Sequence, residues 1–183
     1  MAQDTPPLEV NRMQPAPGRA CGSCAMCCKV FEISELAKPA GPWCRNARPG
    51  KGCAAYEERP GSCRDFLCEW IVDSRYGPEW KPDTAKFAVT AMTASTNVLI
   101  GVDPNFPNAW RREPYMSVIA GWVKAFEAQG RFVIVRIGAR CIALLPDKEV
   151  ELGAVGAGDG VFISREAGPA GYVYSAQVRR RED

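Results

Sequence analysis

The chain has 183 residues, 46% of them hydrophobic and 24% charged, which is the composition of a globular protein and excludes a largely disordered chain. Its 23 Lys and Arg residues nearly balance 21 Asp and Glu residues, so a net charge of +2 gives no reason to expect nucleic acid or a membrane surface as partner. No apolar run approaches the roughly 18 residues that cross a bilayer, and the first residues are Pro-rich and acidic where a secretory signal is basic and apolar. We therefore expect a cytoplasmic protein.

Residues 1–20 are rich in proline and lack hydrophobic periodicity, which predicts a flexible leader. A cysteine cluster follows, because eight of the nine cysteines lie between positions 21 and 68. They are Cys21, Cys24, Cys27, Cys28, Cys44, Cys53, Cys63 and Cys68. In a reducing cytosol, clustered thiols favour metal binding over a disulfide framework, with metal-free thiol redox chemistry as an alternative. The chain contains no histidine, so a transition metal would be held mainly by thiolates.

The spacing of the first four cysteines leaves the identity of the metal open. Four thiolates satisfy zinc tetrahedrally or hold an iron–sulfur cluster. Cys21, Cys24 and Cys27 repeat C-x-x-C as bacterial ferredoxins do, but Cys28 follows directly where those proteins have C-x3-C-P. Adjacent cysteines usually point apart, so we expect Cys27 and Cys28 to serve two metals or to leave one thiol free. Eight thiols suffice for two four-thiolate sites or for one cluster with spare thiols.

The clearest helix signal of the first half begins at Ser62. Ser62 and Asp65 have the S-x-x-D form of a capping box, which predicts a helix from Ser62 to about Arg75. Its apolar face would consist of Phe66, Leu67, Trp70 and Ile71. The helix start would favour an ionised Cys63. Cys63 and Cys68 would lie about 140° apart around an ideal helix, so they could share a metal only if the helix began late or were distorted.

Residues 81–183 carry strand patterns and one strongly amphipathic helix. The helix is expected from about Glu113 to Gln129, with Pro114 in its first turn and Gly130 as its C-terminal cap. The expected strands are residues 86–93, 97–102, 131–137, 141–145, 161–165 and 172–178, with a turn at 94–97. We therefore predict an α+β fold: a small, irregular, metal-stabilised cysteine-cluster region at 21–80, then an antiparallel sheet packed with one helix at 81–183.

A longer signature combines these cysteines with nearby arginine and aromatic residues. It reads Cys21-x-x-Cys24-x-x-Cys27-Cys28, Cys44, Cys53-x-x-Tyr56 and Arg59-Pro60-x-x-Cys63-Arg64-x-Phe66-x-Cys68. This signature resembles the bacterial YkgJ-type CxxCxxCC cysteine-cluster family, described as a zinc- or iron-chelating domain, and covers about residues 21–70. The resemblance implies metal chelation by the eight matching cysteines. Some relatives join such a cluster to protein-lysine methylation, but no cofactor-binding glycine motif supports that activity here, since the glycine-rich residues 153–158 read as a turn.

Other residues of the signature are candidates for supporting the metal. Arg59 and Arg64 could donate hydrogen bonds to cluster thiolates and lower the net negative charge, or they could form surface ion pairs. Aromatic residues are expected to pack around the metal and exclude water, namely Tyr56, Phe66 and Trp70. The ninth cysteine, Cys141, stands among apolar residues and is expected to be a small buried hydrophobe.

These observations predict a metal-binding protein that chelates zinc or iron through an all-cysteine centre, in a structural or metal-handling role, with one or two zinc ions. The alternative is an iron–sulfur protein with a redox or catalytic role, for which a [4Fe-4S] cluster is the expected form. The lack of histidine removes the commonest general base, and no Ser, Lys or carboxylate constellation replaces it, so we do not expect an enzyme. Residues 81–183 would be a scaffold or a surface for an unidentified protein partner. Folding of residues 21–70 should depend on metal, because neighbouring thiolates repel one another.

Overall fold

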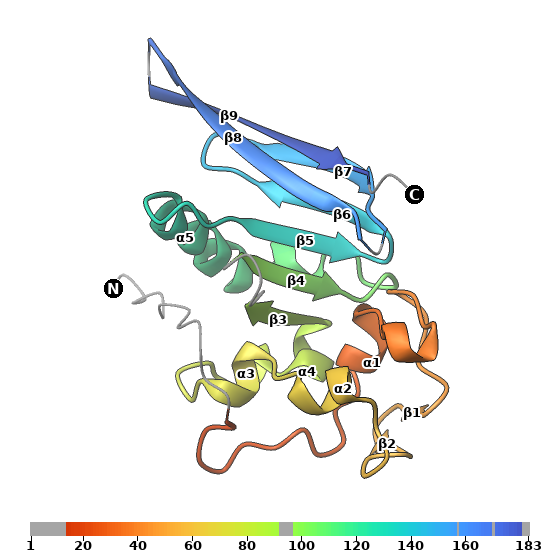
Figure 1. Ribbon diagram of the computed structural model, residues 1–183. Helices are drawn as coiled ribbons and strands as arrows, with labels where there is room; N and C mark the ends of the chain where they lie inside the picture. The colour runs from red at the N-terminus through yellow and green to blue at the C-terminus, as the bar shows by residue number, and fades with distance from the viewer. Residues whose placement is uncertain (1–13, 92–96, 157, 170, 181–183) are drawn as a thin grey trace.

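The main element of the fold is a five-stranded sheet with strand order β3-β4-β5-β6-β7 (Figure 1). A computed structural model describes residues 14–91, 97–156, 158–169 and 171–180 of the chain. The five strands are β3 (Phe87–Ala91), β4 (Val98–Val102), β5 (Val133–Ile137), β6 (Arg140–Leu144) and β7 (Glu149–Ala154). A separate two-stranded hairpin consists of β8 (Gly160–Gly168) and β9 (Gly171–Arg179). The predicted α+β class is confirmed at this level.

The prediction that the sheet is entirely antiparallel is wrong for two of its central strands. Strands β4 and β5 run parallel, in a register that pairs Val98 with Val133 and Val102 with Ile137, while the other neighbouring strands of the sheet are antiparallel. The reason is the long connection between β4 and β5, which contains helix α5 (Tyr115–Glu127). A crossover of this kind returns the chain to the same end of the sheet and so gives a parallel pair.

Both faces of the sheet are covered, which explains why its central strands are nearly all apolar. On one face, Val98, Ile100 and Val133 pack with Trp122 of α5. On the other face, Ile134 and its neighbours pack under β8 and β9. Fully burying a large apolar side chain stabilises a fold by about 1.5–3 kcal/mol. These two layers therefore give the sheet region a core that needs no metal.

Helix α5 agrees with its prediction to within two residues at each end. Pro114 lies directly before it, and the buried stripe of the helix faces the sheet. The stripe consists of Tyr115, Val118, Ile119, Trp122 and Phe126. The expected strands at 97–102, 131–137 and 141–145 are also confirmed, while most of the turn expected at 94–97 falls outside the described residues. Strand β7 has no counterpart among the expected strands, although its Glu-Val-Glu-Leu start does alternate with the period of a strand.

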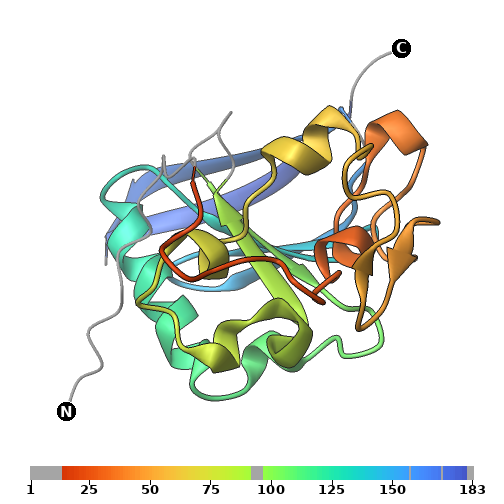
Figure 2. The ribbon, with the colours of Figure 1, turned by 90° about the horizontal axis from the view of Figure 1, so that it is seen from below.

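In residues 14–86 the chain forms only short elements, which lie along the β3 edge of the sheet (Figures 1 and 2). They are α1 (Cys27–Val30), η1 (Ser34–Leu36), β1 (Ala47–Arg48), β2 (Gly52–Cys53), α2 (Gly61–Asp65), α3 (Glu69–Val72), η2 (Pro78–Trp80) and α4 (Pro82–Ala85). One further turn, η3 (Ala109–Arg111), precedes α5. Regular hydrogen bonding is thus sparse in the cysteine region.

The prediction of a continuous helix from Ser62 to Arg75 is wrong. Two short helices, α2 and α3, take its place, and Phe66 and Cys68 between them have extended backbone. Ser62 does not cap a helix, because its backbone N–H and its Oγ donate to the carboxylate of Glu35, at 3.0 and 2.7 Å. The ring of Phe66 packs against that of Phe31, with 5.1 Å between centroids. Tertiary contacts have therefore overridden the local capping signal.

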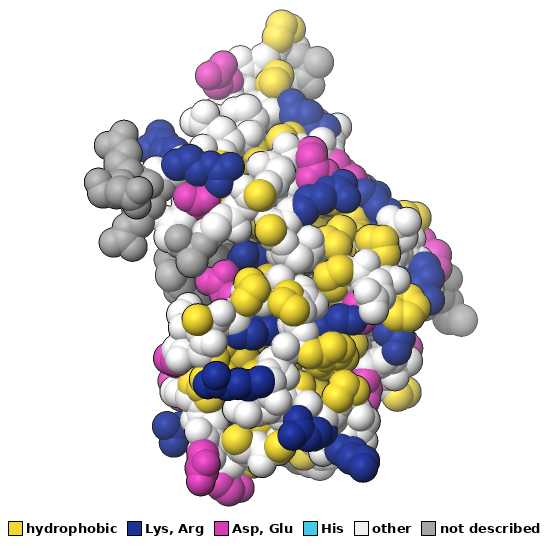
Figure 3. Space-filling view, turned by 90° about the vertical axis from the view of Figure 1, so that its right-hand side faces the viewer, with side chains coloured by type: hydrophobic (Ala, Val, Ile, Leu, Met, Phe, Trp, Pro, Cys, Tyr) yellow, Lys and Arg dark blue, Asp and Glu magenta, His cyan; other side chains and the backbone are white. Residues whose placement is uncertain are grey.

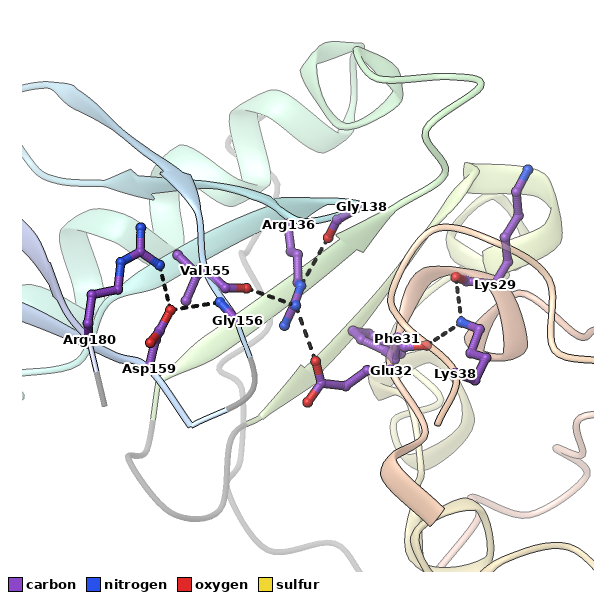
Figure 4. Close-up of polar contacts among 10 residues, drawn as sticks. All are labelled: Lys29, Phe31, Glu32, Lys38, Arg136, Gly138, Val155, Gly156, Asp159 and Arg180. Carbon is purple, nitrogen blue, oxygen red and sulfur yellow. Dashed lines mark hydrogen bonds and ion pairs between the residues drawn. The ribbon is translucent and has the colours of Figure 1, made fainter. Parts of the chain in front are cut away.

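Helix α1 and the residues after it join the cysteine region to the sheet. Lys29 forms a 2.6 Å ion pair with Asp103 at the end of β4, and both side chains are buried. Arg136 of β5 donates to Glu32 at 3.2 Å and to the Val155 carbonyl at 3.1 Å (Figure 4). Gly101 of β4 lies so close to the end of α1 that a methyl group there would meet the ring of Phe31 at 2.6 Å. The two regions are therefore tightly apposed.

The chain near the expected boundary at residue 80 contributes to the core of the sheet region. Tyr76 and Trp80 pack in the same hydrophobic cluster as Trp122. At the N-terminus, residues 1–13 lie outside the described residues, so the flexible leader stays a prediction for them. Arg19, which belongs to the predicted leader, is held by its guanidinium, which donates to the carbonyl oxygens of Trp70, Ser74 and Tyr76.

The molecular surface is mixed in character on the face shown in Figure 3. Lys and Arg side chains are scattered there among hydrophobic, acidic and uncharged ones and form no single block. Among the described residues, no helix combines the length and the apolar character that crossing a membrane requires.

Candidate metal centre

The eight clustered cysteines come from several short segments of the cysteine region. Cys27 and Cys28 open α1, Cys53 ends β2, and Cys63 lies in α2. The other four, Cys21, Cys24, Cys44 and Cys68, lie in the connections between elements. All nine cysteines of the chain are free thiols. None of these thiols is therefore committed to a disulfide.

Three of the cysteines, which we call the strand-side group, pack beside β3. Cys21, Cys24 and Cys68 share a hydrophobic cluster with Ala88 of β3 and with residues of α1 and α3. Burial raises the pKa of all three thiols, that of Cys68 to about 12. Cys24 and Cys21 also add to the raised pKa of Cys68, because nearby thiolates repel a further negative charge.

Three others, which we call the loop-side group, pack in a second cluster with Ile33. Cys28, Cys44 and Cys63 share this smaller cluster with Ala47 of β1. The Cys44 backbone N–H donates to the carbonyl oxygen of Cys28 at 2.9 Å, which fixes these two segments against each other. Burial raises the pKa of Cys63, and the neighbouring thiolates of Cys28 and Cys44 raise it further.

Cys27 and Cys28 lie where the two groups adjoin. Their side chains do not point apart, as adjacent cysteines usually do, but share a hydrogen bond in which Cys27 donates. This bond and the positive charge of Lys38 lower the pKa of Cys28 to about 7. The same bond, together with burial, raises the pKa of Cys27. The pair can therefore hold one proton between two sulfurs.

Lys38 is a candidate functional residue that the sequence did not reveal. Its buried ammonium donates to the carbonyl oxygen of Lys29 at 2.8 Å and to that of Phe31 (Figure 4). Burial lowers the pKa of Lys38, while the thiolates of Cys28 and Cys44 oppose that shift, so its charge faces the loop-side group. A backbone bridge between Ile33 and Lys38 sets this position. A single lysine before Pro39 gave no local signal of it.

The arginines and aromatic residues of the signature are divided between several environments. Arg59 stacks its guanidinium on the Tyr56 ring at 3.8 Å and lowers the pKa of Cys21, whereas burial raises that pKa more strongly. Arg64 is exposed on α2, and its role at the centre stays a prediction. Phe66 and Trp70 pack against the hydrophobic cluster that contains Cys68, and their packing around a metal stays a prediction. Tyr56 does not exclude water as expected, because its side chain is 47% exposed.

The remaining cysteines differ in their surroundings. Cys53 pairs across the small β1–β2 ribbon with Ala47, which packs in the loop-side cluster. Cys141 is buried with Ile134 and Tyr174 beneath the β8–β9 hairpin. The prediction that Cys141 is a small buried hydrophobe is confirmed.

The donor set fits zinc or an iron–sulfur centre in its chemistry, but its sulfurs are not in a ligating arrangement. No group of three or more Cys, Asp or Glu side chains in the described part of the chain is arranged to hold a metal ion. The eight thiols are nevertheless free, and six of them are gathered in two adjoining groups, with Lys38 and Arg59 as neighbouring cations. Metal binding would require the sulfurs of a group to close around the ion.

Comparison with known proteins adds no assignment. No protein-family model matches the chain, and no significant match is found among curated proteins or solved structures.

Proposed function

We propose that residues 21–68 form a metal-binding centre with cysteine thiolates as ligands, zinc or iron as the metal, and a structural or metal-handling role. One observation carries this proposal: eight free cysteines come from separate segments of one region, and six of them pack in two adjoining groups, with a buried lysine beside one group. On the basis of the same cysteine signature, we also propose that the chain belongs to the YkgJ-type family. Nine free thiols also fit a reducing, cytoplasmic location.

The energetics of the cysteine region favour a metal. Its helices and strands have at most five residues each, so regular backbone hydrogen bonds contribute little. Buried free thiols pack like small apolar side chains and add no special stability. A structural zinc ion contributes an apparent binding free energy of about 10–16 kcal/mol, which becomes folding free energy when the unfolded chain has no preformed site. A metal is thus the strongest stabilising term that these residues can recruit.

An iron–sulfur centre with a redox or catalytic role is the second candidate, and a specific observation favours it. The Asn46 backbone N–H donates to the Sγ of Cys44 at 3.5 Å, and the Lys38 cation faces the same group. Hydrogen bonds and positive charge at sulfur ligands set the reduction potential of iron–sulfur clusters. These groups would therefore have a function in a redox centre that a purely structural zinc ion does not need.

Metal and acid-labile sulfide analysis of the full chain, purified without oxygen, tests the proposal. Zinc without sulfide supports the structural or metal-handling centre, whereas iron with matching sulfide and a broad visible absorption supports the second candidate. The Cys141→Ala variant is the matched control and should keep the metal, because Cys141 lies beneath the β8–β9 hairpin. A wild-type protein with neither bound metal nor metal uptake would refute both candidates.

A further inference from the structure

Six thiols of the cysteine region pack in two different hydrophobic clusters, and α1 contributes residues to both. The strand-side group lies in the hydrophobic cluster that includes Ala88 and Ile71, next to the sheet. The loop-side group lies in a different cluster, around Ile33 and Ala47. Each environment contains three of the eight thiols, which leaves Cys27 and Cys53 to be placed.

Cys27 belongs with the strand-side group. Cys27 lies three residues before Val30 in α1 and therefore on the same side of that helix, and Val30 packs with Cys68 in the strand-side cluster. The bond with Cys28 and burial raise the pKa of Cys27 most, and the thiolates of Cys21 and Cys24 add to that shift. The Cys24 backbone N–H donates to the Cys21 carbonyl oxygen at 2.9 Å, a turn that gathers the first C-x-x-C pair beside α1. Cys27 therefore completes a set of four.

Cys53 belongs with the loop-side group. Strand β2 places it opposite Ala47, and the Ala54 backbone N–H donates to the carbonyl oxygen of Asn46 at 2.8 Å. Both partners follow Cys44 closely in the chain, and Ala47 packs with Cys28 and Cys63. The β1–β2 ribbon thus connects Cys53 to the same set.

We propose that the eight cysteines form two adjoining metal sites, one ligated by Cys21, Cys24, Cys27 and Cys68, the other by Cys28, Cys44, Cys53 and Cys63. This inference rests on the proposed function and assigns its ligands. The adjacent residues Cys27 and Cys28 serve different metals and bring the two sites together. Lys38 offsets part of the negative charge at the second site.

This assignment differs from a simple division of the cysteines in chain order. Taken in chain order, the first four cysteines would form one site and the last four the other. The structure exchanges two members, because Cys28 packs with Cys44, and Cys68 packs with Cys21 and Cys24. The break between α2 and α3 permits this exchange by sending Cys63 and Cys68 into different clusters. Double variants can therefore distinguish the two assignments.

Anaerobic titration of the reduced full chain with Co(II), followed by thiolate-to-cobalt charge-transfer absorption, counts the sites that hold cobalt against a competing chelator. We expect two tight sites in the wild-type protein and in the Cys141→Ala control. The Cys24→Ser/Cys68→Ser variant should keep one, because both substitutions affect the same site. The Cys24→Ser/Cys28→Ser variant should keep none, because each site then loses a ligand. The reverse result for these two variants would overturn our assignment in favour of chain order.

A measurement on the wild-type protein guards against variants that misfold. One equivalent of Co(II) is bound, free thiols are trapped with N-ethylmaleimide, and the protected cysteines are mapped by mass spectrometry. Each singly loaded molecule should protect four cysteines from one set. Protection of cysteines from both sets in one molecule, or a wild-type capacity of a single cobalt, would overturn the two-site assignment while leaving metal binding intact. A wild-type protein that takes up no cobalt and no zinc would instead refute the proposed function itself.

Discussion

The sheet region and the cysteine region are stabilised by different means. In the sheet region, β-branched residues fill two apolar layers, and Val98, Ile100, Val133 and Val135 are fully buried. In the cysteine region, short elements surround thiols and buried charges such as Lys29 and Lys38. The apolar core of the sheet region stabilises the fold by excluding water. The buried thiols and charges of the cysteine region stabilise the fold only when they are paired or bind a metal. The two regions should therefore respond differently to mutation and to metal removal.

The largest mutational effect is expected in the sheet core. Trp122 is 1% exposed and contacts Tyr76 and Trp80, so Trp122→Ala should lower the free energy of unfolding by about 3–5 kcal/mol through lost burial and a cavity. Urea unfolding followed by circular dichroism measures this change. Met116, on the exposed side of the same helix, is the matched control, and Met116→Ala should have little effect. Equal effects of the two substitutions would contradict the position of the core.

A somewhat smaller effect is expected at the ion pair between the regions. Asp103→Asn would leave the buried Lys29 ammonium without its partner, which should destabilise the protein by about 3 kcal/mol. Adding Lys29→Met should recover much of the loss, because the unpaired charge is then removed. Glu151→Gln, which breaks the exposed pair between Arg140 and Glu151, is the control and should leave stability unchanged. If Asp103→Asn is as harmless as that control, the buried pair does not join the regions.

A still smaller effect is expected where β4 meets α1. Gly101→Ala places a methyl group 2.6 Å from the Phe31 ring and 2.9 Å from Val30, so the end of α1 must shift. We expect a loss of about 1–3 kcal/mol, with most of the accompanying increase in hydrogen exchange in the cysteine region. Gly61→Ala in α2 is the control, because its methyl group would make only an ordinary contact, with Glu35 Oε1 at 3.9 Å. An increase in hydrogen exchange confined to the sheet after Gly101→Ala would contradict this contact.

Apart from β7, the strands and α5 were predictable because each carries its own pattern of apolar residues. Tyr115, Val118, Ile119 and Trp122 make one face of α5 in any surroundings, and Val98 to Val102 suits a buried strand. The parallel pairing of β4 and β5 was not predictable from these local patterns, because it follows from the path of the connection that contains α5. Local periodicity specifies an element but not its neighbours.

The cysteine region was predictable in composition but not in arrangement. The eight thiols and their spacing indicated metal chemistry, yet nothing near Ser62 revealed that Glu35 would bind it and break the expected helix. The grouping of Cys28 with Cys44, and the position of Lys38 beside them, likewise depend on contacts between distant segments. Such contacts leave no periodic pattern in the sequence.

Hydrogen exchange of the full chain, with and without a metal chelator, tests most directly whether a metal organises the cysteine region. We predict that chelation removes protection from the described amides of residues 21–72 while β4, β5 and β6 keep theirs, because the sheet has its own apolar core. Unchanged protection of residues 21–72 would contradict a metal-dependent cysteine region. An equal loss of hydrogen-exchange protection in the sheet would contradict the claim that the sheet core is stable without the metal.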